Sequence, residues 1–190
     1  MEALLVIDMQ CGFDDPRWGR RNNPAAEANG LRLLRAWRHA RRPVVMVRHD
    51  SREPASPLRP GQPGNAPRPG FMPQAGDLSI AKTVNSAFIG TTLESDLRAL
   101  GVTAVTLFGL TTDQCVSTTA RMAANLDFAT TVVGDACACF GQVAPDGRAV
   151  DADLIHLAHL TTLNTEFGRV VTTEALIHSL ETFACQPCAS

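Results

Sequence analysis

Three residues that lie far apart in the sequence could together carry out covalent hydrolysis: Asp8, Lys82 and Cys115. A cysteine attacks carbon as a thiolate, and its pKa falls from about 8.5 beside a cation or at a helix N-terminus. Lys82 would supply the cation, and backbone N–H groups of the turn before Cys115 would add the helix dipole. Asp8 could accept the thiol proton and return it to a leaving amine.

Each of these residues also has an ordinary structural explanation. A carboxylate after a strand often caps a turn, a lysine at a strand end is usually solvated, and a cysteine often packs as a small apolar residue. The placement of the three favours chemistry, because each follows or ends a predicted strand. Open α/β sheets bind ligands at the carboxyl ends of their strands.

Short apolar runs alternate with helical patterns along the chain. Because such alternation implies parallel strands joined by right-handed crossovers, it predicts an α/β fold, a three-layer αβα sandwich. The expected strands are 3–7, 44–47, 80–84, 102–107, 129–133 and 170–171, and the later expected helices are 113–127, 151–163 and 173–183.

Two further helices are predicted from capping signals. Asn23-Pro24 is typical of an N-cap followed by the first helical residue. Thr91-x-x-Glu94 matches a capping box, and an apolar stripe continues the helix to a glycine that suits the position after its end. That stripe and glycine are Leu93, Leu97, Leu100 and Gly101.

The segment 49–77 interrupts this alternation. It contains seven of the twelve prolines and leaves the carboxyl end of the second strand. A connection this long inside a compact domain is either a functional loop or a disordered one. We expect it to contribute a wall of the active site.

The overall composition argues against several classes of function. With 190 residues, 45% of them apolar and 19% charged, the chain predicts one globular domain spanning 1–190. A net charge of −2 without a basic patch argues against nucleic acid as a partner. No apolar run approaches the roughly 20 residues of a membrane helix, and the N-terminus lacks signal-peptide features. We therefore expect a cytoplasmic protein that acts on a small molecule.

The six cysteines show no disulfide framework. Cys137-x-Cys139 and Cys185-x-x-Cys188 could supply four zinc ligands, but a structural zinc site usually has two C-x-x-C pairs, and only one pair has that spacing. A redox role for the last pair would require it to open a helix after a strand, whereas it follows a helix. We expect these residues to be apolar packing residues and tail residues in a reducing compartment.

Four motifs in this order resemble the isochorismatase-like cysteine hydrolases, which include nicotinamidases and N-carbamoylsarcosine amidohydrolases. The motifs are LLVIDMQCGF at 4–13, AKTVNSAF at 81–88, GLTTDQCVSTTARMA at 109–123 and TTVVGDAC at 130–137. The resemblance extends over nearly the whole chain. It implies a six-stranded, mainly parallel sheet and a homo-oligomer, either a dimer or a tetramer.

The resemblance also implies residue roles. Asp8, Lys82 and Cys115 take the positions of the family's catalytic triad. A non-proline cis peptide is implied at Leu110-Thr111, and the N–H groups of Thr111 and Cys115 would form the oxyanion hole.

Three further residues are candidate walls of the substrate pocket: Phe13, Trp18 and His49. His49 is equally compatible with a structural hydrogen-bonding role. The sequence does not identify the substrate, because small amides, ureides and N-carbamoyl compounds all fit a thiol-dependent cleavage of a C–N bond.

Two differences from related families indicate which reaction to expect and whether it needs a metal. Isochorismate hydrolases, which split a vinyl ether, lack the nucleophilic cysteine, so Cys115 favours amide-type cleavage. Nicotinamidases carry a metal site built on Asp-x-His with a further histidine, whereas this stretch has only His49 and Asp50. We therefore predict no metal and no cofactor.

Two non-hydrolase alternatives remain for comparison. A related binding or assembly protein without activity would have a damaged triad, and this triad is complete. A dinucleotide-binding protein would need G-x-G-x-x-G after the first strand, where this chain has DMQCGF at 8–13.

Overall fold

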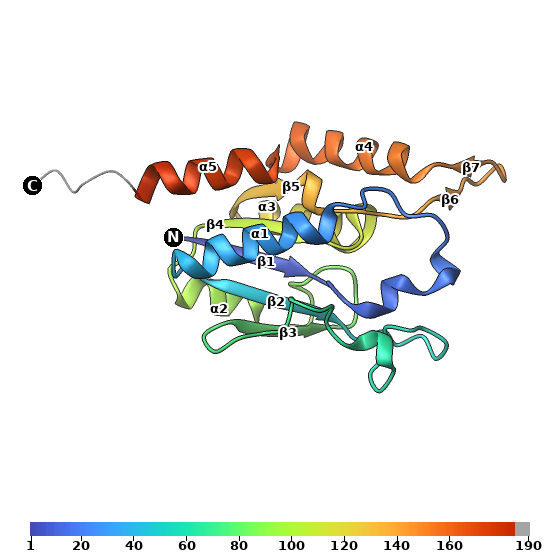
Figure 1. Cartoon of the computed structure of the whole chain (residues 1–190), viewed down its shortest axis with the longest axis horizontal. Helices are drawn as coiled ribbons and strands as arrows, with labels where there is room; N and C mark the ends of the chain where they lie inside the picture. The colour runs from blue at the N-terminus through green and yellow to red at the C-terminus, as the bar shows by residue number, and fades with distance from the viewer. Residues whose placement is uncertain (185–190) are drawn as a thin grey trace, which may run out of the picture.

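The computed structural model describes residues 1–184, and its centre is a six-stranded parallel sheet in the order β3-β2-β1-β4-β5-β8 (Figure 1). Every pair of neighbouring strands in it is parallel. The strands are β1 (Glu2–Ile7), β2 (Val44–His49), β3 (Leu78–Lys82), β4 (Ala104–Gly109), β5 (Ala129–Val133) and β8 (Arg169–Val171).

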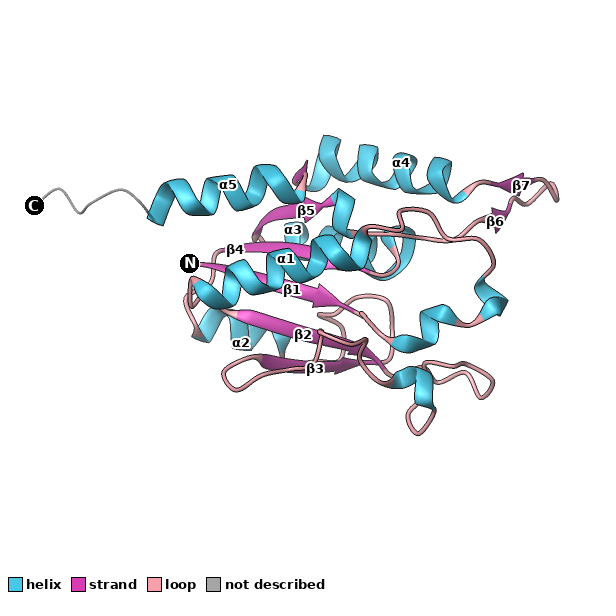
Figure 2. Ribbon diagram, viewed as in Figure 1, coloured by secondary structure: helices cyan, strands magenta, loops and turns pink. Residues whose placement is uncertain are grey.

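Helices cover both faces of the sheet, which confirms the predicted three-layer αβα sandwich. In Figure 2, α1 lies in front of the strands and α2 and α3 lie behind them. Helix α5 packs beside α1, and α4 packs against the turn that carries Cys115. The helices are α1 (Ala26–His39), α2 (Leu93–Ala99), α3 (Ser117–Asn125), α4 (Ala152–Thr162) and α5 (Thr173–Ala184).

The buried core explains the short apolar runs in the sequence. Strand β1 is buried from Ala3 to Ile7, because helices cover both of its faces. Helix α1 turns Leu33, Leu34 and Trp37 toward this core. Among residues 1–184, no helix is long and apolar enough to cross a membrane.

The strand order places a crevice between β1 and β4. The chain runs from β1 outward to β2 and β3, then returns to β4 and continues outward through β5 to β8. The loops after β1 and β4 therefore leave in opposite directions, and ligands bind at such switch points in open α/β sheets. Asp8 follows β1 directly, and the segment from Leu110 to Cys115 follows β4.

Close contact between these two strands requires a glycine at the end of β4. Gly109 has φ 139°, and a Cβ atom there would lie 2.0 Å from the carbonyl oxygen of Ile7. A side chain at this position would push β1 and β4 apart. Gly109 therefore keeps the two loops of the crevice together.

The prediction that Asn23 caps the first helix is wrong. Asn23 has φ 42° and lies before a turn, and α1 begins at Ala26. The Asn23 side chain instead donates to the carbonyl oxygens of Asp135 and Cys137, at 2.9 and 2.7 Å. The asparagine is used for a long-range contact that local sequence does not reveal.

The predicted capping box at Thr91 is also wrong in its contacts. The Thr91 hydroxyl donates to the carbonyl oxygen of Ala87 and accepts from the backbone N–H of Leu93. Glu94 pairs with Arg98 one turn later instead of reaching back. The end of this helix agrees with prediction, since Gly101 has φ 69° directly after the C-cap residue.

Other element limits shift by a few residues. Strand β3 ends at Lys82 rather than at 84, and Leu100 is exposed instead of completing the apolar stripe of α2. The helix expected over 113–127 begins as a π-helical turn, Thr112–Val116, before α3. A small hairpin of β6 (Gln142–Val143) and β7 (Ala149–Val150) was not predicted.

The cysteine pairs of the sequence do not converge in the described part of the chain. Cys137 and Cys139 are buried, and their thiols approach different carbonyl oxygens, those of Val133 and Ala152. This agrees with a packing role. Cys185 and Cys188 lie outside the described residues.

Candidate active site

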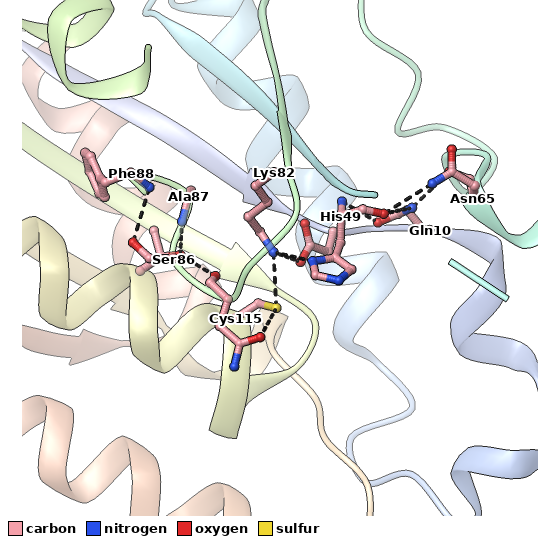
Figure 3. A network of polar contacts seen from close by, with 11 residues as sticks. Gln10, His49, Asn65, Lys82, Ser86, Ala87, Phe88 and Cys115 are labelled. Atoms are coloured by element: carbon pink, nitrogen blue, oxygen red, sulfur yellow. Dashed lines mark hydrogen bonds and ion pairs between the residues drawn. The ribbon is translucent and has the colours of Figure 1, made fainter. Parts of the chain in front are cut away.

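The structure brings Asp8, Lys82 and Cys115 together at the carboxyl ends of three strands. Figure 3 shows the side chains of Lys82 and Cys115 in contact. Asp8 follows β1 with φ 50°, Lys82 is the last residue of β3, and Cys115 lies in the π-helical turn after β4. All three side chains are buried. The sheet order thus joins groups that are separated by more than thirty residues in the chain.

The Lys82 ammonium group lies at the centre of this cluster. Its Nζ atom is 2.6 Å from Oδ2 of Asp8, 3.2 Å from Sγ of Cys115 and 3.1 Å from Nδ1 of His49. An ammonium group has three N–H donors, so these three acceptors use its full capacity.

Burial and charge shift the pKa values of Asp8 and Lys82 in opposite directions. Burial raises the pKa of Asp8, although the Lys82 charge opposes this. Burial alone would lower the pKa of Lys82, but the charges and hydrogen bonds of Asp8 and Cys115 together outweigh burial and raise that pKa. Oδ1 of Asp8 has no hydrogen-bond partner among the described residues, so this carboxylate retains an open acceptor.

The expected lowering of the Cys115 pKa is wrong for the free protein. Burial raises the pKa of the Cys115 thiol, and the nearby Asp8 carboxylate raises it further. The Lys82 ammonium lowers it, but by less. Because burial disfavours charge, the thiol is neutral at neutral pH until its proton can move to a base.

His49 enters this cluster as a neutral imidazole. Burial lowers its pKa, and the neighbouring Lys82 charge lowers it further. Lys82 keeps its proton, so Nδ1 of His49 accepts from the ammonium. The sequence suggested a pocket wall or a structural hydrogen-bonder here, and the structure shows that His49 lines the cavity and contacts Lys82.

The same residues provide the one cluster of metal-type ligands found within residues 1–184. Ligand atoms of Asp8, His49 and Cys115 all lie within 4.8 Å of one another. A carboxylate, an imidazole and a thiolate could hold zinc. However, each of these groups contacts the Lys82 ammonium, which takes the place of a cation. The residues present therefore do not fit a resident metal ion.

A cavity of about 390 Å³ opens above the thiol. The predicted pocket residues Phe13, Trp18 and His49 line it, as do Thr111 and Cys115. Its remaining lining comes from five segments of the chain: Arg17, Ser51, Ser56, Leu58, Asn85, Asp113, Gln114, Phe140, Gly141 and Gln142. The segment 49–77 thus contributes Ser51, Ser56 and Leu58 to the wall.

Three aromatic rings form one side of this cavity. The ring centroids of Phe13 and Trp18 are 5.7 Å apart, and Phe140 lies 6.3 Å from Phe13 and 5.9 Å from Trp18. The indole N–H of Trp18 donates to the carbonyl oxygen of Gly12, which fixes the ring. Phe140 was not predicted, because it follows β5 and no local pattern ties it to the first loop.

The turn before Cys115 offers a donor to the cavity. The Leu110-Thr111 peptide bond is cis, and the carbonyl oxygen of Thr111 accepts from the backbone N–H of Val116. Within residues 1–184, the backbone N–H of Thr111 donates to no protein acceptor. This N–H is thus available to a ligand in the cavity that Thr111 lines.

Two side-chain amides that the sequence did not point to, the buried Gln10 and the half-buried Asn65, connect the cluster to the loop 49–77. Gln10 accepts from the backbone N–H of His49 and donates to the carbonyl oxygens of His49 and Asn65 (Figure 3). Asn65 donates to the carbonyl oxygens of His49 and Leu58 and to the carboxylate of Asp50. Gln10 lies only two residues after Asp8, but its partners are 39 and 55 residues away.

Comparison with known proteins agrees with this architecture. Solved structures include an isochorismatase-family hydrolase from Chromobacterium violaceum, which is 44% identical with a TM-score of 0.92 over 95% of this chain and 94% of that one. The N-carbamoylsarcosine amidase from Thermoplasma acidophilum has a TM-score of 0.71 at 24% identity over 91% of this chain and 96% of that one, which shows a shared fold.

Sequence relatives give the same family. The isochorismatase family protein YrdC of Bacillus subtilis is 42% identical over 177 residues, which cover 93% of this chain and 95% of YrdC. The ureidoacrylate amidohydrolase RutB of Variovorax paradoxus is 33% identical over 109 residues, 57% of this chain and 39% of RutB. Residues 2–175 match the isochorismatase domain model. The chain therefore belongs to the isochorismatase family of hydrolases.

Proposed function

We propose that this protein is a cysteine-dependent hydrolase of amidase type, which cleaves a C–N bond of a small amide, ureide or N-carbamoyl compound. One observation carries the proposal. The Cys115 thiol lines the cavity and shares a single buried ammonium with the Asp8 carboxylate. Nucleophile, base and electrostatic partner thus lie within reach of one bound substrate.

The first half of the proposed reaction forms a covalent intermediate. Asp8 takes the thiol proton as Sγ of Cys115 bonds to the carbonyl or carbamoyl carbon. The N–H groups of Thr111 and Cys115 stabilise the oxyanion that develops. The C–N bond then breaks, and the amine leaves with the proton that Asp8 received. Lys82 keeps its charge throughout and stabilises the negative charge on sulfur.

The second half regenerates the thiol. Asp8 accepts a proton from a water molecule, whose oxygen attacks the thioester or thiocarbamate carbon. The carbon–sulfur bond breaks, and the proton held by Asp8 passes to sulfur. The net reaction adds one water to the C–N bond. No electron transfer is involved, and Cys115 returns to the neutral form that burial favours.

The named relatives support this substrate class. RutB is described as acting on ureidoacrylate, and the Thermoplasma acidophilum protein is named for an N-carbamoyl substrate. Both compounds carry a carbamoyl nitrogen. The cavity of about 390 Å³ suits a small molecule with polar groups that packs against the Phe13–Trp18–Phe140 wall.

The test is ammonia release from a panel of small amides, ureides and N-carbamoyl compounds. We expect at least one compound to be hydrolysed, and Cys115→Ala to retain less than about 1% of the wild-type rate, since loss of a nucleophile costs several orders of magnitude. Cys11→Ala is the matched control, because Cys11 is a half-buried thiol outside the cavity lining.

Different results would contradict the proposal in different ways. Hydrolysis that persists in folded Cys115→Ala would exclude the covalent route. Cleavage of a vinyl ether, with no C–N substrate in the panel, would assign the protein to the isochorismate reaction instead. Tight binding of a panel compound without turnover would favour a binding or assembly protein.

A further inference from the structure

His49 accepts the third N–H of the Lys82 ammonium, the group that stabilises the thiolate in the proposed mechanism. It is the last residue of β2, next to β3, and the two strands pair His49 with Lys82 in register. This register brings Nδ1 of His49 to 3.1 Å from Nζ of Lys82. Strand pairing thus places the imidazole beside the lysine, at hydrogen-bond distance.

We propose that His49 is a positioning residue that directs the Lys82 ammonium toward the sulfur of Cys115. The inference rests on the proposed function in one respect, that Cys115 is the nucleophile. An ammonium group rotates about its Cε–Nζ bond, and its N–H groups point to the corners of a tetrahedron. Two acceptors leave one N–H unpaired in a buried site, which is unfavourable. The third acceptor fixes the rotation.

The distances show why the third acceptor matters. The Asp8 oxygen, 2.6 Å from Nζ, is a closer partner than the Cys115 sulfur at 3.2 Å. Sulfur is a weak acceptor when neutral. Without His49, the ammonium would therefore turn further toward Asp8, and the developing thiolate would lose part of its stabilisation.

His49 is itself held by groups outside the reacting cluster. Its backbone N–H and carbonyl oxygen are both bonded by the Gln10 side chain, at 2.8 and 3.1 Å. Asn65 adds a second donor to the same carbonyl at 3.2 Å. Figure 3 shows this chain of contacts from the loop to Lys82. The backbone from which the imidazole projects is thereby fixed by Gln10, just after β1, and by the loop 49–77.

The positioning role requires a neutral His49 imidazole. Nδ1 can accept from Lys82 only while the imidazole is neutral. Burial lowers the pKa of His49, and Lys82 adds to this effect, while the carboxylates of Asp8 and Asp50 act in the opposite direction. The balance keeps His49 neutral at neutral pH.

The experiment distinguishes two roles for His49: a hydrogen-bond acceptor for Lys82, or a residue that only lines the cavity. The rate of Cys115 alkylation by iodoacetamide is measured against pH in the substrate-free protein, with the modified peptide followed by mass spectrometry. In His49→Leu, we expect the profile to move about one unit to higher pH, since the thiolate loses a hydrogen bond. His49→Asn, whose amide oxygen can replace Nδ1 as acceptor, should restore the wild-type profile.

Kinetics on a hydrolysed substrate gives the second measurement. We expect kcat of His49→Leu to fall about tenfold with a smaller change in KM, because an interaction made in the transition state is lost. Ser51→Ala is the matched control. Ser51 lines the same cavity without contacting Lys82, so this variant should change KM alone and leave the alkylation profile in place.

Two results would overturn the inference. One is a His49→Leu profile equal to that of wild type. The other is a shift of the same size in His49→Asn, since the loss would then not be that of an acceptor. If His49→Leu does not fold, His49→Ala carries the same expectations. Alkylation needs no substrate, so a shifted profile in a protein without amidase activity would contradict the proposed function and leave the positioning role intact.

Discussion

The Cys115 thiol has two charged neighbours that act on its proton in opposite directions. Lys82 stabilises the thiolate and Asp8 destabilises it, and burial adds to the effect of Asp8. A permanently charged thiolate would be unfavourable in this site. The proton therefore stays on sulfur in the free protein, and in the proposed mechanism it moves to Asp8 as the new carbon–sulfur bond forms.

This arrangement predicts an unusual effect of Asp8→Asn. Removing the carboxylate removes two contributions that raise the pKa of Cys115 and leaves Lys82 as its charged partner. We expect iodoacetamide to alkylate Cys115 several-fold faster at pH 7 in this variant, because more of the sulfur is thiolate. Hydrolysis should nevertheless be lost, since no base remains to protonate the leaving amine.

Asp14→Asn is the control for that variant. It removes the same charge from an exposed residue that pairs with Arg68 and does not face the sulfur. It should change neither the alkylation rate nor turnover. Slower alkylation in Asp8→Asn than in wild type would mean that Asp8 promotes the thiolate in the free protein, contrary to the structure.

The sequence predicts which residues approach one another better than it predicts their electrostatics. Asp8, Lys82 and Cys115 follow or end recognisable strands, so their common edge could be inferred. The direction of the Cys115 pKa shift could not, because it depends on burial and on the nearness of Asp8. The contact of His49 with Lys82 depends on the register of β2 against β3, which local patterns do not define.

At the scale of elements, the strands were predicted well and the starts of helices were not. Buried parallel strands are continuous apolar runs, and β5 was predicted with its observed limits. Asn23 and Thr91 carry residue types typical of helix caps, yet Asn23 bonds the distant carbonyl group of Asp135, and Thr91 bonds that of Ala87, four residues before it. Capping signals compete with such contacts, so they locate helix starts less reliably.

Asn65 should control the order of the loop 49–77. Its amide donates to Leu58, His49 and Asp50, at 2.8, 3.2 and 3.0 Å, so it ties the middle of the loop to its start. We expect Asn65→Ala to increase proteolysis within residues 51–62 several-fold, because local opening becomes easier. KM should rise, since Leu58 and its neighbours line the cavity.

Gln62→Ala provides the comparison for that experiment. Gln62 is exposed in the same loop and contributes a backbone hydrogen bond rather than a buried side chain. Its proteolysis pattern should match that of wild type. Equal protection in Asn65→Ala would show that the loop keeps its order without the Asn65 side chain, contrary to this prediction.

At the scale of the whole molecule, the alternation of strands and helices was enough to predict the three layers. The expected homo-oligomer stays a prediction, because no local pattern in the sequence marks an interface between subunits. The single domain over 1–190 also stays a prediction, and it can be tested with the two tryptophans. Trp18 lies at the cavity wall, and Trp37 is a fully buried residue of α1.

A single domain should unfold as one cooperative unit. We expect the thermal midpoints from far-UV circular dichroism and from tryptophan fluorescence to agree within about 1 °C. Trp18→Phe leaves only Trp37 as a reporter, and its midpoint should coincide for both probes as well. An early fluorescence transition present in wild type and absent in Trp18→Phe would show that the cavity wall unfolds separately from the sheet.

The neutral, buried state of Cys115 also affects how the protein withstands oxidants. Peroxide converts cysteine to sulfenic acid through the thiolate, and further oxidation is irreversible. A sulfur that stays protonated and almost inaccessible between turnovers presents little thiolate to peroxide. If Cys115 is the nucleophile proposed above, we expect its sulfur to become reactive only with substrate bound and to stay reduced between turnovers. Oxidative inactivation should be fastest when Asp8 cannot hold the thiol in its neutral state.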